Sequence, residues 1–200
     1  PGQRRGPNSA CAGPWSGLRC IACAVQGLAR GAALTQVARA DLSLREAEMQ
    51  FDIDPDIARA ATPPSAVYHD PGMYRLQRER VFARSWQVAG DAARLKAPGH
   101  VIPFTLLPGC LDEPLVLTRD QDGTAHCMSN VCTHRGALVV EGEGHVATLR
   151  CRYHGRRFGL DGCLQHMPEF DDVVGFPAPS DDLPRLPLRT WGPLLFTSLD

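Results

Sequence analysis

The sequence predicts an all-β fold, in which short antiparallel hairpins form one domain and a single short helix precedes it. Short apolar runs follow one another from residue 86 to residue 200, without helical periodicity of any length. Turn signals such as Asp122-Gly123 and Asp161-Gly162 lie between these runs. Short runs joined by such turns are typical of paired antiparallel strands.

The helix is expected over residues 71–84. Asp70 offers an N-cap, and Pro71 stands at the first helical position, where its missing N–H costs no hydrogen bond. Apolar side chains then recur at near-helical spacing, at Met73, Tyr74, Leu76, Val81 and Phe82. We therefore expect residues 49–85 to form a lead-in that contains this helix, and residues 86–200 to form the β domain.

Seven runs are expected to contain the strands of this domain. They are Trp86–Ala89, Val101–Leu107, Pro114–Thr118, Thr124–Asn130, Val146–Arg150, Arg157–Leu160 and Leu194–Leu199. Each is rich in apolar residues and is bounded by Pro, Gly or Asp, as strands of an antiparallel domain usually are.

Residues 1–48 differ from the rest, because no Asp or Glu occurs before Asp41 and more than half of those positions are Ala, Gly, Arg or Pro. An organelle transit peptide is also rich in Arg and poor in acids, but should contain more Ser. A secretory signal would need a better apolar core than residues 20–28 provide. We favour translated sequence upstream of a start at Met49, and expect no fold in this leader.

Composition excludes several classes of protein. The formal net charge of −1 argues against a nucleic-acid surface, and no run of eighteen apolar residues could span a membrane. Eight cysteines in 200 residues are too few for a disulfide scaffold. Beyond the two that the next motif uses, we expect free thiols in a cytoplasmic protein, or in an organelle if the leader is a transit peptide.

Four residues carry the chemistry, in the pattern Cys132-x-His134 followed by Cys151-x-x-His154. Two thiolates and two imidazoles in two short loops suit a [2Fe–2S] cluster in which one iron takes both Cys and the other both His. Gly136 and Gly155 follow the two histidines and would let backbone N–H groups approach the cluster. The pattern therefore predicts an electron carrier with these four residues as cluster and metal ligands.

Two other interpretations of the four residues remain open. A structural zinc site accepts Cys2His2, although its usual order is a Cys pair followed by a His pair rather than one of each in every loop. The four residues could also meet by accident, with Cys in the core and His on the surface, but the two following glycines make this the weaker alternative.

The motifs resemble the Rieske domain of ring-hydroxylating oxygenase large subunits. The resemblance rests on Cys132-Thr-His134-Arg135-Gly136, Cys151-Arg-Tyr153-His154-Gly155 and Phe158-Gly159-Leu160-Asp161-Gly162, and it covers most of residues 50–200. It implies a Rieske-type β-sandwich of small sheets with two cluster-binding loops at one tip, and one [2Fe–2S] cluster per chain.

The resemblance also implies a function in electron relay. A reductase or ferredoxin would supply electrons, which the chain would pass to the mononuclear Fe(II) of a mono- or dioxygenase that hydroxylates an organic substrate, an aromatic ring in many relatives. In relatives the second histidine, here His154, reaches a carboxylate beside the iron of the neighbouring subunit in a homotrimer. A stand-alone Rieske ferredoxin is the alternative function, and a zinc-bound structural module is a remote one.

The catalytic iron domain of the family is absent from these residues. Two of its ligands occur in relatives as His-x-x-x-x-His, and no two histidines here have that spacing. We therefore expect an N-terminal fragment of an oxygenase large subunit, with no catalytic residue of its own.

Two positions depart from related proteins. Respiratory Rieske proteins join their loops by a disulfide, whereas Ala137 and Tyr153 stand at those places here, so packing and hydrogen bonds must hold the loops. Arg156 stands where the oxygenase family commonly has Trp, and we expect it on the loop surface, where it would affect docking rather than cluster assembly.

Overall fold

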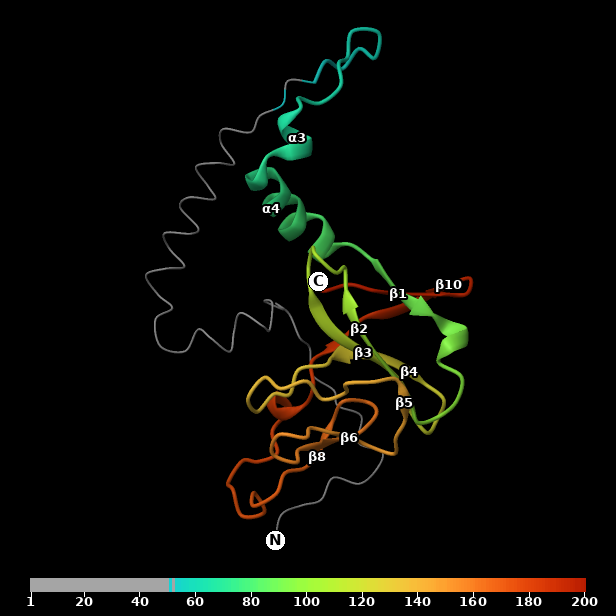
Figure 1. The fold of residues 1–200 in the computed structure, drawn as a ribbon, viewed down its shortest axis with the longest axis vertical. Helices are drawn as coiled ribbons and strands as arrows, with labels where there is room; N and C mark the ends of the chain where they lie inside the picture. The colour runs from blue at the N-terminus through green and yellow to red at the C-terminus, as the bar shows by residue number, and fades with distance from the viewer. Residues whose placement is uncertain (1–50, 52) are drawn as a thin grey trace.

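The computed structural model describes residues 51 and 53–200, so the predicted leader at residues 1–48 lies outside the described part. Two helices, α3 (Ala66–His69) and α4 (Pro71–Arg80), extend away from the strands, as Figure 1 shows in blue-green. The Tyr74 hydroxyl donates a 3.0 Å hydrogen bond to the Gly109 carbonyl in the β2–β3 connection. This bond fastens the helical arm to the β domain.

The helix prediction is confirmed at its start and wrong at its end. Asp70 Oδ1 accepts a 2.8 Å hydrogen bond from the Met73 N–H, as an N-cap should. The α-helix ends at Arg80, and a separate 3₁₀ turn, η1, covers Phe82–Arg84. The Ser85 hydroxyl donates to the Val81 carbonyl at 2.7 Å, which satisfies a group that the ended helix leaves without its usual partner.

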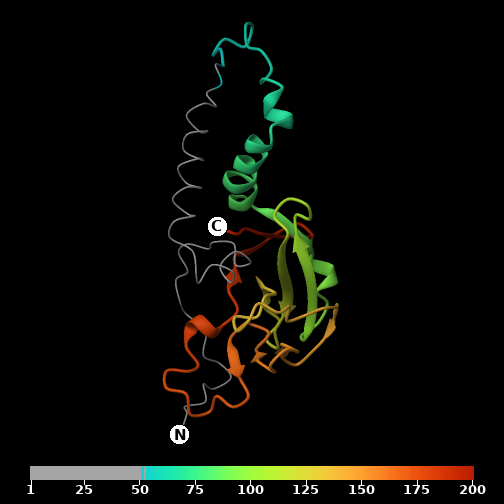
Figure 2. The same cartoon turned by 60° about the vertical axis from the view of Figure 1, so that its left-hand side comes forward.

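Three small antiparallel sheets form the rest of the described chain (Figures 1 and 2). Their orders are β1-β11-β10, β5-β2-β3-β4-β9 and β6-β7-β8. The strands are β1 (Gln87–Asp91), β2 (His100–Leu106), β3 (Glu113–Arg119), β4 (Ala125–Ser129), β5 (Gly144–His145), β6 (Leu149–Arg150), β7 (Arg157–Phe158), β8 (Leu164–His166), β9 (Arg185–Leu186), β10 (Leu188–Trp191) and β11 (Leu194–Thr197). Two further 3₁₀ turns are η2 (Ala92–Arg94) and η3 (Pro179–Asp181). The predicted all-β fold of small sheets is confirmed.

The five-stranded sheet lies between two hydrophobic cores, because its side chains alternate between its faces. Leu115 and Leu117 of β3 pack in a core with Leu195 of β11, next to the β1-β11-β10 sheet. Val116 of β3 packs instead in a second core with Phe158 of β7, next to the β6-β7-β8 sheet. The second core is the one that supports the candidate site.

Each of the seven predicted runs overlaps a strand, whereas four strands and one helix were not predicted. Those missed are β5, β8, β9, β10 and α3, none longer than four residues. Elements this short show no period of their own, so their pairing depends on strands that lie far away in the sequence. Within the described residues, no helix has the length and hydropathy needed to cross a membrane.

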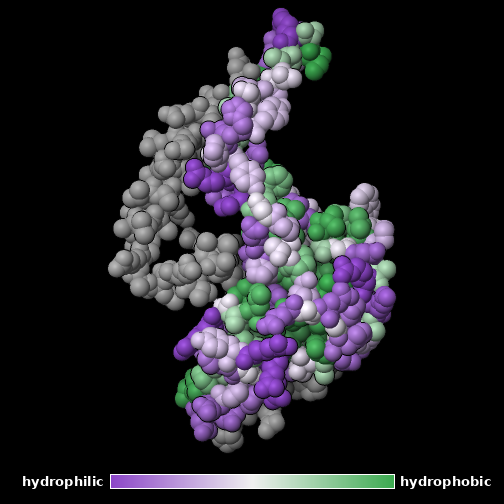
Figure 3. Space-filling view, in the orientation of Figure 1, coloured by the Kyte–Doolittle hydropathy of each residue, from purple (hydrophilic) through white to green (hydrophobic). Residues whose placement is uncertain are grey.

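The surface is mixed in character. Hydrophobic and hydrophilic residues are interspersed over the strands on the face shown in Figure 3. Exposed large apolar side chains include Tyr153, Val174 and Trp191. Among the described cysteines, Cys110, Cys127, Cys132 and Cys151 are free.

The β3–β4 hairpin provides a test of stability. Burial by itself raises the pKa of Asp120, but hydrogen bonds from His126 Nε2 at 2.7 Å and from the Thr124 N–H at 2.8 Å outweigh it and lower the pKa. A lowered folded-state pKa stabilises the protein above the unfolded value of about 3.9, and this contribution is lost as the pH falls through the folded value.

Asp120→Ala is therefore expected to reduce the free energy of unfolding by about 1–2 kcal/mol at neutral pH. Urea unfolding at a series of pH values should show the difference from wild type shrinking below about pH 4. Asp122→Ala changes an exposed residue of the same turn and serves as the control. Equal losses in the two variants, or a loss that does not depend on pH, would contradict this assignment.

Candidate metal centre

Two loops carry the four predicted ligands. The first ligand loop, residues 131–138, follows β4, and the second, residues 151–156, connects β6 to β7. The second ligand loop ends a hairpin, because β6 pairs with β7. The first does not, because β4 pairs with β3 and β9, and an isolated bridge between Val131 and Leu138 closes that loop instead.

A buried asparagine secures the base of the first ligand loop. Asn130 Nδ2 donates to the Val140 carbonyl at 2.8 Å, and Asn130 Oδ1 accepts from the Val140 N–H at 2.8 Å. The side-chain amide thus replaces a backbone partner for Val140, and the loop closes without a paired strand. Sequence reasoning did not select Asn130, because an asparagine at a strand end is an ordinary turn residue.

The two loops have the same backbone hydrogen bonds around their cysteines. In each, the cysteine N–H donates to the carbonyl five residues later, and the cysteine carbonyl accepts from the glycine N–H four residues later, at 2.8–3.1 Å. Gly136 and Gly155 have φ angles of +71° and +78°, which glycine adopts without strain. Their own N–H groups therefore close the loops, and the approach of other backbone N–H groups to a cluster stays a prediction.

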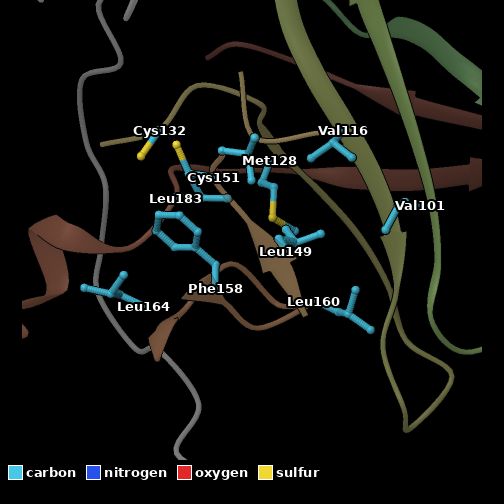
Figure 4. Close-up of a cluster of buried hydrophobic side chains, with 11 residues drawn as sticks. Val101, Val116, Met128, Cys132, Leu149, Cys151, Phe158, Leu160, Leu164 and Leu183 are labelled. Atoms are coloured by element: carbon cyan, nitrogen blue, oxygen red, sulfur yellow. The ribbon is translucent and has the colours of Figure 1, made fainter. Parts of the chain in front are cut away.

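The structure places the four side chains in two pairs. Cys132 and Cys151 are buried at the edge of the second core, and Figure 4 shows their sulfur atoms beside each other. The rings of His134 and His154 lie edge to face, with their centroids 4.7 Å apart. Each pair draws one residue from each loop.

The local chemistry fits a bound metal centre. Burial is the main cause that raises the pKa of the Cys132 thiol, and a hydrogen bond from the His134 backbone partly offsets it. Burial, and then the charge of Arg156, lowers the pKa of His134, so the ring is neutral at neutral pH, the form that binds metals. His134 Nδ1 is buried and has no hydrogen-bond partner within the described residues, so coordination would satisfy it.

The pairing also fits the centre that the sequence predicts. In a Rieske-type [2Fe–2S] centre the two cysteines would hold one iron and the two histidines would hold the other. Within residues 51 and 53–200, no three His, Cys, Asp or Glu side chains gather as a site for a single metal ion.

Arg156 does not lie where the sequence analysis expected it. Its side chain is buried, with the residue 5% exposed, rather than on the loop surface. Its guanidinium contacts Thr133 in the first ligand loop and Asp181 in η3, both far away in the sequence. No local signal marks this burial, since Arg156 is followed by the exposed Arg157 and resembles any solvated loop residue.

Comparison with known proteins agrees with the geometry. The family model described as "Rieske [2Fe-2S] domain" matches residues 85–177. The chloroplastic choline monooxygenase of Amaranthus tricolor is 36% identical over 76% of this chain, and the chlorobenzene dioxygenase subunit alpha of Cupriavidus sp. (strain PS12) is 29% identical over 78%. A crystal structure of the quaternary ammonium Rieske monooxygenase CntA with L-carnitine superposes with a TM-score of 0.66 at 26% identity.

These relatives are longer than the chain. The match covers 33% of the choline monooxygenase, 31% of the dioxygenase subunit and 43% of the CntA chain. The CntA superposition covers 75% of this chain. The chain thus spans about a third of the length of the curated relatives it matches.

Proposed function

Because residues 85–177 belong to the Rieske [2Fe–2S] domain family, we propose that this chain binds one [2Fe–2S] cluster through Cys132, His134, Cys151 and His154. The observation that carries the proposal is the separation of two thiols and two imidazoles into pairs, each with one member from each loop. Such a cluster, when bound, exchanges one electron at roughly −150 to +300 mV.

Each pair has a separate task in this proposal. Cys132 and Cys151 would hold one iron from within the core, where their surroundings exclude water. His134 and His154 would hold the other iron through ring nitrogens. The Tyr153 ring lies 3.8 Å from the His154 ring, centroid to centroid, and restricts its orientation.

His154 is our proposed electron exit. His154 is partly exposed. His134, in contrast, has a buried Nδ1 without a hydrogen-bond partner among the described residues. In a Rieske centre one imidazole nitrogen binds iron and the other is free to bond an outer partner. His154 therefore suits contact with an acceptor, which we propose to be a carboxylate beside the mononuclear iron of a neighbouring subunit in a trimer.

The full-length protein would use this relay in a Rieske oxygenase. A reductase or ferredoxin would supply the electrons, and a separate iron domain would hydroxylate the substrate with O2. We propose a quaternary ammonium substrate rather than an aromatic ring, since the choline monooxygenase is 36% identical and the chlorobenzene dioxygenase subunit 29%. In this proposal residues 86–200 form the Rieske domain, and residues 49–85 form the lead-in before it.

The location of the protein is also a proposal. The cytoplasm suits a chain with several free thiols, and an organelle is the alternative. The choline monooxygenases that match are named chloroplastic, so a role of residues 1–48 in targeting is testable by mapping the translation start.

Metal analysis tests the proposed function. The purified chain is expected to be red-brown, and to contain two irons and two acid-labile sulfides per molecule without stoichiometric zinc. A colourless protein with one zinc would establish the structural-module alternative. If the chain of this length forms the whole gene product and still exchanges electrons, the stand-alone ferredoxin is correct instead of the oxygenase component.

A further inference from the structure

The two ligand loops are joined by a buried arginine. Arg156 Nη1 donates a 2.8 Å hydrogen bond to Thr133 Oγ1, and Thr133 lies between Cys132 and His134. Arg156 itself belongs to the second ligand loop, two residues after His154. The Arg156 guanidinium therefore connects the second ligand loop to the first ligand loop.

The same guanidinium reaches a third segment. Arg156 Nη2 lies 3.1 Å from Asp181 Oδ1 in η3, and the Thr133 hydroxyl donates to the Asp181 carbonyl at 2.7 Å. The three residues thus form a closed set of contacts, in which the Thr133 hydroxyl both accepts and donates. The second Asp181 oxygen, Oδ2, accepts from the Ala178 N–H at 2.9 Å, which fixes the carboxylate in its turn.

Packing also restricts the arginine. Arg156 Nε donates to Met167 Sδ at 3.1 Å, and the guanidinium carbon lies 5.6 Å from the centre of the Phe176 ring. Because Arg156 is 5% exposed, water screens its positive charge poorly, and the charge acts on its neighbours more strongly than a surface charge does, although the Asp181 carboxylate offsets part of it.

We propose that Arg156 is a positioning residue that joins both ligand loops to η3, through Thr133 and Asp181, and that its fixed charge favours the reduced cluster. This inference rests on the proposed function, because it assumes a cluster between the loops. The contacts among Arg156, Thr133 and Asp181 take the place of a covalent connection between the loops, since Ala137 and Tyr153 cannot form a disulfide. Reduction adds negative charge to the site, and a nearby buried cation stabilises that charge.

The test compares four variants of the cluster-loaded chain. Arg156→Gln removes the charge and most of the guanidinium N–H donors. Arg156→Lys keeps the charge but loses the planar arrangement of these donors. Thr133→Val removes the hydroxyl but leaves the charge of Arg156 in place. Arg157→Gln removes the adjacent, exposed arginine of β7 and is the matched control. The measurements are the reduction potential, the rate of iron loss to a chelator, and the melting temperature.

Arg156→Gln is expected to make one-electron reduction about tenfold less favourable, which lowers the potential by about 59 mV, and to speed iron loss. Its melting temperature should fall by roughly 5–10 °C, because Asp181 loses its buried partner. Arg156→Lys should keep a potential near that of wild type while losing iron faster. Thr133→Val should also lose iron faster without a change of potential, and Arg157→Gln should match wild type in all three measurements.

Several results would overturn the inference. It is wrong if Arg156→Gln and Arg157→Gln have equal potentials and equal rates of iron loss. If Arg156→Gln cannot be isolated with iron, Thr133→Val decides, because iron loss at the wild-type rate would show that the contact does not hold the loops. A wild-type chain without iron would instead refute the proposed cluster. The melting temperatures of Arg156→Gln and Arg157→Gln would then still test whether the contacts of Arg156 with Thr133 and Asp181 hold the loops together.

Discussion

Cys132→Ser is expected to abolish cluster binding, leaving little of the wild-type iron and of its visible absorption. In the proposed centre Cys132 and Cys151 would provide the two thiolates of one iron, and a serine hydroxyl is both harder and much less acidic than a thiol. The loss should also destabilise the fold, because both cysteines belong to the core that carries Phe158, and cluster binding is coupled to folding there.

Iron analysis and absorbance spectra of the purified variant are the measurements. Cys110→Ser is the control, because Cys110 is a free, partly buried thiol in the β2–β3 connection, away from both ligand loops. It should retain wild-type iron. A Cys132→Ser protein with undiminished iron and absorption would remove Cys132 from the ligand set and with it the proposed pairing.

Phe158→Ala should cost about 3–5 kcal/mol of unfolding free energy, the usual range for truncating a buried phenylalanine. Phe158 is 0% exposed and lies in the second core together with Cys132 and Cys151, as Figure 4 shows. The cavity would lie directly beneath the cysteines, so the variant should also lose iron faster than wild type. Denaturant unfolding and chelator competition measure the two effects.

Phe51→Ala provides a comparison with the same change of side chain. Phe51 is 37% exposed, and its truncation should change stability by less than about 0.5 kcal/mol. Similar losses in the two variants would mean that the second core does not support the site as described. A large loss of stability in Phe158→Ala with unchanged iron retention would separate the core from the metal centre.

The fold could be predicted where the sequence carries a local signal. The N-cap at Asp70 and the short apolar run of β3 are local patterns, and the structure places the helix start and the strand accordingly. The end of α4 was not predictable, because the apolar spacing continues through Phe82 although the backbone changes at Val81. Strands such as β9 are set by pairing with β4, which no local pattern reveals.

The candidate site shows the same division. The spacing of Cys132, His134, Cys151 and His154 indicated the ligands, and the structure brings these side chains together in pairs; their binding of iron stays a proposal. The surroundings were not predictable. Asn130 and Arg156 acquire their roles from partners that lie ten or more positions away, and the wrong placement of Arg156 shows that a charged loop residue can be buried when other segments satisfy it.

The same pair of backbone hydrogen bonds closes a ring of main-chain atoms in each ligand loop, and this backbone ring fixes the length of the loop. Each ring is closed by a donor four residues after the cysteine and an acceptor five residues after it, so adding or deleting one residue between Cys132 and Gly136 would break both bonds at once. Length changes between Val140 and Gly144 involve neither ring. Insertions and deletions among related sequences should therefore fall outside the two backbone rings. The histidine, however, can shift by one position relative to the cysteine, because His134 lies two residues after Cys132 and His154 lies three residues after Cys151.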